Sequence, residues 1–366
     1  MDPRLLTDPV VRDREALLEF VDALDDHAPL IERDVARLKR VPNDPAAIAE
    51  IFRAVHNIKG DAALSKVELA VAIAHPIETT LGRLRAGEFV FSELLAEAIL
   101  LAVDRLELAA TTLANGKSLD PLRLPALVGG LERLALAEPG ATDAEASALI
   151  EAVTGFRASA ATPNLGSDAA APFATARVAG TDDLRFFREL ALRFESRSPL
   201  FKGRTSRLLR LSRETNQAAG QPIDQGQLEA AVYLHDVGMM FLPESAWLKV
   251  GHLSAGELKD LRAHPEIGAG LLTRMQGWDG AAEIVAQHHE KPDGSGYPRG
   301  LSGGICAGAR LLAIVDAFEA VMLKHIHRGR NRSVLRAIAE VNACEKQFAP
   351  EWIAPFNQVI RRAIEG

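Results

Sequence analysis

Apolar residues at helical spacing run through most of this chain, and one long stretch of small residues interrupts them. Residues 14–137 are typical of helix after helix, rich in Ala, Leu and Glu, and the same periodicity returns at residue 182 and continues almost to residue 366. Strands alternating with helices are absent from the pattern, as is any repeat of fixed period. An all-α protein with two helical domains is therefore expected.

The interruption, residues 138–181, is dense in Ala, Gly, Ser, Thr and Pro and contains no lysine. Residues 145–156 are compatible with one helix, but residues 158–179 have little to bury. We therefore predict a linker here. It would separate an N-terminal domain, residues 14–137, from a C-terminal domain, residues 182–366, and would let the two move relative to one another.

Composition narrows the range of functions. A formal net charge of -7 and an aromatic content of 5% argue against nucleic-acid binding, which normally uses a basic face or stacked aromatic rings. Cys306 and Cys344 form no CxxC pair and suit a reducing compartment. No apolar run approaches the roughly 18–20 residues needed to span a bilayer, and the N-terminus lacks the apolar core of a secretory signal. A cytoplasmic protein with no membrane partner is expected.

Three helices of the N-terminal domain can be placed from the sequence. Asn43-Asp44-Pro45 is a helix-start signal. It precedes a stripe of apolar residues predicted to be buried: Ile48, Ile51, Phe52, Val55 and Ile58. A second helix is predicted from about residue 66 to 86, with Gly87 as its C-terminal stop, and a third from about residue 92 to 114. Short connections between helices of this length favour an antiparallel bundle.

The first candidate site is His56, at the edge of the apolar stripe. Lys59 and Gly60 follow it by three and four residues, so both lie beside it on one face of the helix. A phosphoryl acceptor needs an exposed imidazole, a nearby cation and room for the phosphate. Lys59 offers the cation, and Gly60 removes a side chain that would crowd the phosphate. The alternative is an ordinary surface histidine.

This HxxKG pattern resembles the signature of histidine-phosphotransfer (HPt) domains, four-helix bundles that relay phosphate between receiver aspartates. The resemblance covers roughly residues 14–115 and includes the segment Ala74-His75-Pro76-Ile77-Glu78. It implies that His56 is phosphorylated and that Lys59 is its electrostatic partner. His75 precedes a proline, has no Lys-Gly after it, and is interpreted as structural. Because no ATP-binding module is recognisable, the partner expected to supply phosphate is a response-regulator receiver domain.

The C-terminal domain holds a second candidate site, built from histidines and aspartates in segments typical of helices or helix ends. Its members are His235, Asp236, His264, His288, His289 and Asp316. Imidazoles and carboxylates together suit Fe, Mn or Zn. An adjacent His-Asp pair lets the carboxylate bridge two ions, which together can activate a water for phosphoryl displacement. One or two divalent metal ions are therefore the expected cofactors.

The surrounding residues resemble the HD-GYP family over about residues 183–365. The matching segments are Leu234-His235-Asp236-Val237-Gly238, His264-Pro265-Glu266-Ile267-Gly268 and the loop that contains Asp293, Gly294, Gly296, Tyr297 and Pro298. The resemblance implies an all-α, metal-dependent phosphodiesterase of the kind that hydrolyses cyclic di-GMP. It also implies that Asp236, His264, His288 and His289 hold one metal. The other metal would use His235, Asp236, Asp316 and an upstream histidine.

Three departures from the family pattern affect this site. Arg204 occupies the position of the upstream histidine, and its charge would oppose a second ion. Met239 replaces the lysine of the HDxGK motif, and residues 323–328 replace an Arg-Pro-Tyr segment. Three interpretations stay open: an impaired or inactive domain that still binds metal, a working phosphodiesterase with an altered site, and a metal-free scaffold.

The expected protein is a phosphorelay signalling protein with an HD-GYP-like output domain. Its main competitor is a non-enzymatic adaptor that binds receiver or other signalling proteins. Partners beyond the receiver are cyclic di-GMP or a diguanylate cyclase-type protein. The histidines outside the matched ligand positions, which are His252, His325 and His327, are interpreted as solvated or locally hydrogen-bonded.

Overall fold

The computed structural model describes residues 4–9, 11, 13–156, 181–247, 253–327, 334–344 and 347–365. Every regular element within these ranges is an α-helix or a 3-10 helix, which confirms the all-α prediction. The chain divides into two compact units, of which the first is Met1–Thr162 with Arg328–Ala343 and the second is Pro163–His327 with Cys344–Gly366. Within the described residues, no helix has the length and apolar character that crossing a membrane would require.

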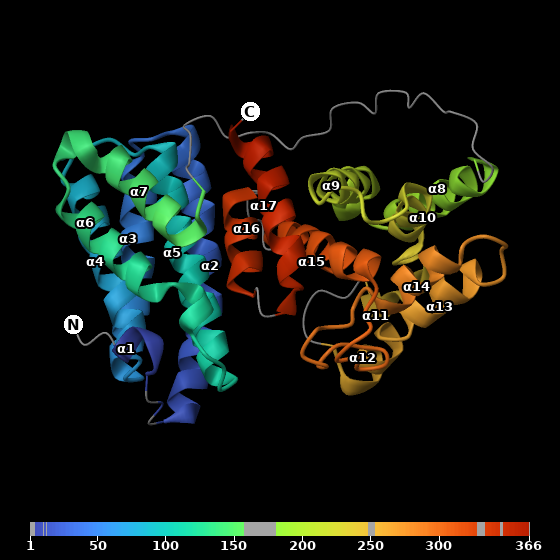
Figure 1. The fold of residues 1–366 in the computed structure, drawn as a ribbon. Coiled ribbons are helices and arrows are strands. Elements are labelled where there is room, and N and C mark those ends of the chain that lie inside the picture. The colour runs from blue at the N-terminus through green and yellow to red at the C-terminus, as the bar shows by residue number, and fades with distance from the viewer. Residues whose placement is uncertain are drawn as a thin grey trace. The chain divides into compact units, whose positions relative to one another are not determined.

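The first unit is a helical bundle (Figure 1). Its elements are α1 (Arg4–Thr7), α2 (Arg14–Arg40), α3 (Pro45–Leu64), α4 (Glu68–Arg85), α5 (Glu93–Ala114), η1 (Asp120–Leu122), α6 (Leu124–Leu136), η2 (Pro139–Ala141), α7 (Thr142–Thr154) and α16 (Val334–Ala343). Helix α3 packs against α2 and α4, and α5 packs against α2 and α7.

The helix boundaries follow from local signals. Asp44 caps α3 by accepting hydrogen bonds from the backbone N–H of Ala46 at 3.0 Å and of Ala47 at 3.2 Å, and Ser92 caps α5 through the N–H of Leu95 at 3.1 Å. Gly87 follows the end of α4 with a positive φ of 77°, a backbone conformation that glycine adopts without strain. The predicted starts and stops of these helices are confirmed to within about two residues.

The stretch predicted as a linker contains part of the bundle. Helix α7 begins at Thr142 and packs against α5 and α6. Its buried face includes Leu149, Ile150 and Val153, which is enough apolar surface to hold an alanine-rich helix against its neighbours. Residues 157–180, the remainder of the predicted linker apart from its last residue, lie outside the described part of the chain.

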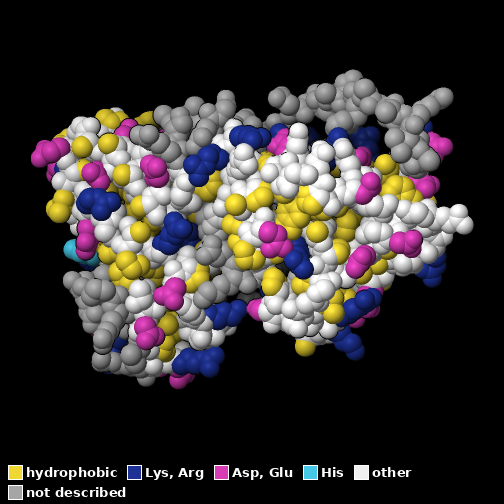
Figure 2. All heavy atoms as spheres, viewed as in Figure 1, with side chains coloured by type: hydrophobic (Ala, Val, Ile, Leu, Met, Phe, Trp, Pro, Cys, Tyr) yellow, Lys and Arg dark blue, Asp and Glu magenta, His cyan; other side chains and the backbone are white. Residues whose placement is uncertain are grey.

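The second unit is also helical. It contains α8 (Thr181–Glu195), η3 (Pro199–Phe201), α9 (Arg204–Ala218), α10 (Gln225–Leu234), η4 (Val237–Phe241), α11 (Glu244–Trp247), α12 (Ala255–Leu261), α13 (His264–Leu272), α14 (Asp279–Gln287), α15 (Ala307–His327) and α17 (Pro350–Glu365). Helix α10 packs against α8, α9 and α14, and α15 packs against α9, α14 and α17. Figure 2 shows acidic and basic side chains interspersed over the visible surface.

Candidate functional site

His56 projects from α3 with 60% of its side chain exposed. Ile51, Val55 and Ile58 are buried, as predicted for the apolar stripe. Phe52 was predicted to lie in that stripe, but it is only half-buried. Its ring stacks beside the His56 imidazole, with 6.3 Å between ring centroids, and the Arg85 guanidinium lies 4.1 Å from its centroid. An aromatic ring between a cation and an imidazole is stable at the edge of a core, which accounts for the difference.

Glu78, on α4, binds both His56 and Lys59. One carboxylate oxygen lies 2.6 Å from His56 Nδ1, and the other accepts a hydrogen bond from Lys59 Nζ. Burial alone would raise the pKa of Glu78, but the bonds from Lys59 and His56 outweigh it and lower the pKa. Because a carboxylate only accepts hydrogen bonds, the proton belongs on Nδ1, and Nε2 carries the lone pair. The imidazole is therefore oriented as a nucleophile.

The surroundings of His56 leave space for a phosphoryl group. A Cβ added at Gly60 would meet no atom within 4 Å, and the side chain of Lys59 is 27% exposed. His75 is more exposed still, at 68%, and its Nδ1 lies 4.0 Å from Glu78. The sequence prediction noted the segment around Glu78 but gave that residue no role. The three-residue spacing between His75 and Glu78 offered no way to know that Glu78 faces His56.

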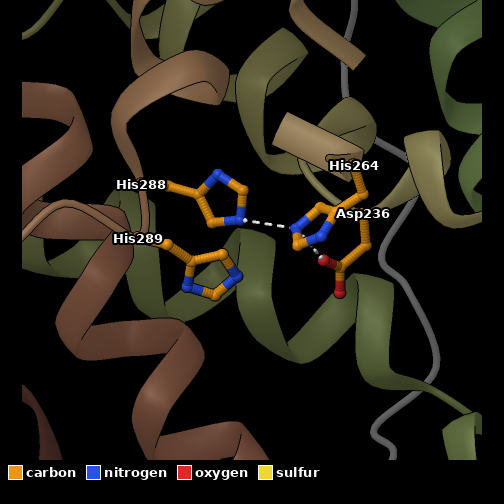
Figure 3. A group of neighbouring side chains, drawn as sticks. All are labelled: Asp236, His264, His288 and His289. Atoms are coloured by element: carbon orange, nitrogen blue, oxygen red, sulfur yellow. Dashed lines mark hydrogen bonds and ion pairs between the residues drawn. The ribbon is translucent and has the colours of Figure 1, made fainter. Parts of the chain in front are cut away.

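The six histidines and aspartates of the second unit come together at the ends of several helices. His235 and Asp236 directly follow α10, His264 begins α13, His288 and His289 follow α14, and Asp316 lies within α15. Two overlapping groups each have their ligand atoms within 4.8 Å of one another. The larger group comprises Asp236, His264, His288 and His289, which Figure 3 shows facing one another.

Three imidazoles of this cluster are oriented in the same way. His235, His264 and His288 each place Nδ1 at 2.7–2.8 Å from the backbone carbonyl oxygen three residues earlier. A carbonyl accepts only, so Nδ1 is protonated and Nε2 faces the centre. Metal-bound histidines are typically held by such a second bond. Burial lowers the pKa of His264 to about 4 and that of His288 to about 3, so both rings are neutral at neutral pH.

The larger group fits a divalent cation. The Nε2 atoms of His264 and His288 lie only 3.4 Å apart (dashed in Figure 3), and with Nδ1 protonated on both rings no proton lies between them. Oδ1 of Asp236 is buried without a hydrogen-bond partner in the described residues and lies 3.5 Å from His264 Nε2. Facing lone pairs and an unpaired buried carboxylate oxygen are costly without a cation. Nitrogen and oxygen donors of this kind suit Fe, Mn or Zn.

The smaller group, which comprises His235, Asp236 and Asp316, already contains a cation. Arg204 Nη1 lies 2.8 Å from Asp236 Oδ2, and Arg204 Nη2 lies 2.7 Å from Asp316 Oδ1. The same Nη2 lies 3.4 Å from His235 Nε2. The guanidinium thus takes the carboxylate oxygens that a second ion would need. These residues do not fit a second metal.

The fold holds Arg204 in this position. Arg204 is the first residue of α9, and the carboxylate of Glu195 accepts hydrogen bonds from the backbone N–H of Gly203 at 2.6 Å and of Thr205 at 2.9 Å. One turn later, Arg207 Nε donates to the buried Glu319 of α15 at 2.7 Å. Two arginine–carboxylate contacts therefore fix α9 against α15. Burial would lower the pKa of Arg204, but Asp236 and Asp316 outweigh it and raise the pKa.

Comparisons with known proteins match both units. Residues 15–109 match the Hpt domain family, and residues 192–351 match the HD domain family. The chain therefore contains a segment that matches the Hpt domain family, followed by a segment that matches the HD domain family. The predicted resemblance is thereby confirmed for both parts of the chain.

Curated relatives match part of this chain over part of their own length. The cyclic di-GMP phosphodiesterase response regulator RpfG of Xanthomonas campestris pv. campestris is 42% identical over 98 residues, which are 26% of each chain. A cyclic di-GMP phosphodiesterase of Thermotoga maritima is 31% identical over 134 residues, 36% of each chain. The 3'3'-cGAMP-specific phosphodiesterase 2 of Vibrio cholerae is 42% identical over 98 residues, 26% of this chain and 19% of its own. The chain thus covers about a third or less of these relatives.

The loop that gives HD-GYP domains their name is folded against the ligand histidines. The Tyr297 ring stacks on His289 with 4.7 Å between centroids. Glu290 is buried and accepts hydrogen bonds from the backbone N–H of Arg299 at 2.7 Å and of Leu301 at 2.9 Å. A Cβ at Gly296 would come within 2.4 Å of the backbone nitrogen of Lys291, so only glycine fits.

The other predicted residues of this loop lie in turns or bends, and Met239 lies outside the loop. Asp293 accepts a hydrogen bond from the Ser295 hydroxyl at 2.6 Å, Gly294 has a φ of 75°, and Pro298 follows a cis peptide bond. Met239 lies half-buried in η4, next to the ligand-bearing turn. His252, Arg328 and the side chains of residues 324–327, His325 and His327 among them, lie outside the described residues.

Proposed function

We propose that this protein is a phosphorelay signalling protein in which His56 accepts a phosphoryl group and the HD domain is a one-metal output domain with impaired phosphodiesterase activity. The match to an HPt domain and an HD domain supports the signalling architecture. The proposal of an impaired, one-metal HD domain rests on one observation: the Arg204 guanidinium lies between Asp236 and Asp316. The two-metal mechanism needs an ion at that position.

In the HPt domain, Nε2 of His56 would attack the phosphorus of an aspartyl phosphate on a receiver domain. The new N–P bond forms as the bond from phosphorus to the receiver carboxylate breaks, and the carboxylate leaves with the electron pair. His56 Nδ1–H donates a hydrogen bond to the Glu78 carboxylate, whose oxygen lies 2.6 Å from the nitrogen. This carboxylate would stabilise the imidazole as it becomes positive. Lys59, which binds the same Glu78 carboxylate as His56, would offset the charge of the phosphoryl group.

In the HD domain, one ion held by Asp236, His264, His288 and His289 would supply Lewis-acid chemistry to a bound phosphate. The protein's own groups orient that ligand set through the Nδ1–carbonyl bonds. The guanidinium of Arg204 lies where the second metal ion would bind. Its positive charge can attract a phosphate, but it cannot coordinate and activate a water molecule as a metal ion does. Met239 adds no cation. A cyclic di-GMP-type ligand would therefore bind more readily than it is hydrolysed.

Two kinds of substrate are proposed from the relatives. The curated relatives include both cyclic di-GMP and 3'3'-cGAMP phosphodiesterases. Both ligands carry two phosphodiesters, so the same pocket chemistry would serve either. Binding and hydrolysis of each should be measured separately with the full chain.

The enzyme half of the proposal is tested by hydrolysis assays with added Mn or Fe. We expect little or no turnover for the wild type, and a gain of turnover for the Arg204→His/Met239→Lys double variant. Wild-type turnover similar to that of an active family member would overturn the impairment and favour a working phosphodiesterase with an altered site. If the protein binds neither a metal nor a cyclic dinucleotide, the non-enzymatic interpretation is favoured. The protein would then be an adaptor that binds receivers or diguanylate cyclase-type proteins.

The HPt half is tested by phosphotransfer from purified receiver domains. Wild type should become labelled and His56→Ala should not. His75→Ala is the matched control, because His75 is also an exposed histidine close to Glu78, and it should label like the wild type. Equal labelling of the wild type and His56→Ala would show that His56 is not the acceptor.

A further inference from the structure

Helix α16 belongs to the HD domain by sequence and to the HPt unit by structure. Its residues, Val334–Ala343, fall inside the segment 192–351 that matches the HD domain. In the folded chain, however, α16 forms part of the first unit, while Pro163–His327 and Cys344–Gly366 form the second. The HD segment therefore contributes one helix to the HPt bundle.

The contacts of α16 are those of an integral bundle helix. It packs against α5, α7 and η1. Leu335, Ile338 and Val341 are all buried. Burying these apolar side chains stabilises the helix on the bundle, although burial alone does not determine which surface a helix covers. The charged groups of α16 provide that specificity.

Arg336 is the centre of a buried ionic cluster. Its side chain is 1% exposed, and its Nη2 lies 2.8 Å from Glu32 of α2. Nε and Nη2 also bind the two carboxylate oxygens of Asp104 on α5. From the other direction, Arg105 Nη2 of α5 donates to the backbone carbonyl of Ala339 at 2.8 Å. Two arginines thus interlock α16 with α5, and a helix in another register would leave these charges buried without partners.

This docking uses a different part of the bundle from the candidate phosphorylation site. His56 lies on α3 and is oriented by Glu78 on α4, whereas the contacts of α16 are with α2, α5, α7 and η1. Figure 1 shows α16 beside α2 and α5. The contacts of α16 therefore leave His56 and Glu78 uncovered by α16 itself.

We propose that α16 is a docking helix by which the HD segment is held on the HPt bundle, with the Arg336–Asp104–Glu32 cluster fixing its position. The chain consequently connects the two units three times: between α7 and α8, between α15 and α16, and between α16 and α17. A single linker would connect them once. Helix α15, which carries Asp316, ends seven residues before α16 begins. The proposal depends neither on phosphate at His56 nor on metal in the HD domain.

Hydrogen exchange of the full-length protein, followed by mass spectrometry, tests this docking. In the wild type, peptides from α16 and from α5 around Asp104 should both exchange slowly. Arg336→Asp places a carboxylate against Asp104 and Glu32, so exchange in both peptides should become at least about 100-fold faster. The Arg336→Asp/Asp104→Arg variant reverses the pair and should return both peptides toward the wild-type rate.

The control is Arg133→Asp, which removes an exposed arginine of α6 that pairs with Glu145 at 3.2 Å. It should leave the exchange of α16 and α5 unchanged. The proposal is overturned if Arg336→Asp leaves α16 protected, or if it exposes α16 without any change in α5. Failure of the charge-reversed pair to restore protection would overturn the role of the ionic cluster.

Discussion

Removing Arg204 should destabilise the second unit strongly in metal-free protein. The guanidinium lies 2.8 Å from Asp236 and 2.7 Å from Asp316, and all three groups are buried. Each contact is worth about 6 kcal/mol of Coulomb attraction at an effective dielectric constant of about 20, but desolvation offsets much of it. Breaking a buried ion pair by removing one partner typically costs about 3–5 kcal/mol. We expect that loss for Arg204→Ala.

The loss should depend on pH in a defined direction. Burial would raise the pKa of Asp236, but His235 and Arg204 outweigh it and hold the pKa well below its ordinary value. A lowered folded-state pKa contributes stability that is present above the unfolded-state pKa, near 3.8, and is lost as the pH falls further. In Arg204→Ala, protonation of the carboxylates relieves their repulsion. The difference from wild type should therefore be largest near pH 7 and shrink toward pH 4.

Urea unfolding of chelator-treated full-length protein measures this effect. The three tryptophans, Trp247, Trp278 and Trp352, all belong to the second unit, so fluorescence reports on that unit alone. Arg210→Ala is the matched control, because Arg210 is on the same helix with 45% of its side chain exposed, and it should change the stability by no more than about 0.5 kcal/mol. Equal stability of the Arg204→Ala and Arg210→Ala variants at pH 7 would refute the reasoning.

Three further predictions concern the two sites. Glu78→Gln should slow phosphotransfer to the HPt domain about 10-fold or more, because an amide does not stabilise the developing imidazolium; thermal unfolding is the control and should change little. Gly296→Ala should destabilise the HD domain by at least about 2 kcal/mol, since its Cβ would meet backbone within 2.4 Å; an unchanged denaturation midpoint would contradict the packing. Burial lowers the pKa of His264, His288 and His289 to about 4, 3 and 4, so protons should displace bound metal only below about pH 5, not near 6.5, as a pH titration of metal retention would reveal.

Local sequence signals were sufficient for the helical fold, whereas the resemblance to the HD-GYP family predicted which histidines and aspartates lie together. Asp44 and Ser92 act through neighbouring backbone groups, so their capping role is visible in a few residues of sequence. His264 and His288 occupy motifs whose backbone fixes the ring through the carbonyl three residues earlier. In such cases the sequence neighbourhood determines the geometry.

Features that depend on packing between distant helices could not be predicted. The charge of Arg204 was expected to oppose a second ion, but its contact with both Asp236 and Asp316 depends on how α9 packs against α15. The partnership of Glu78 with His56 depends in the same way on the packing of α3 against α4. Helix α16 falls within the segment that matches the HD domain, and the contacts of Arg336 with Asp104 and Glu32, both more than 230 residues away, place it in the other unit.

The number of metal ions per chain tests the central claim most directly. Full-length protein loaded with Mn, Fe or Zn and freed of excess metal should retain about one ion per chain, held by the group that contains Asp236, His264, His288 and His289. Two tightly bound ions per chain in the wild type would contradict the account, because the second could bind only if Arg204 left the two carboxylates.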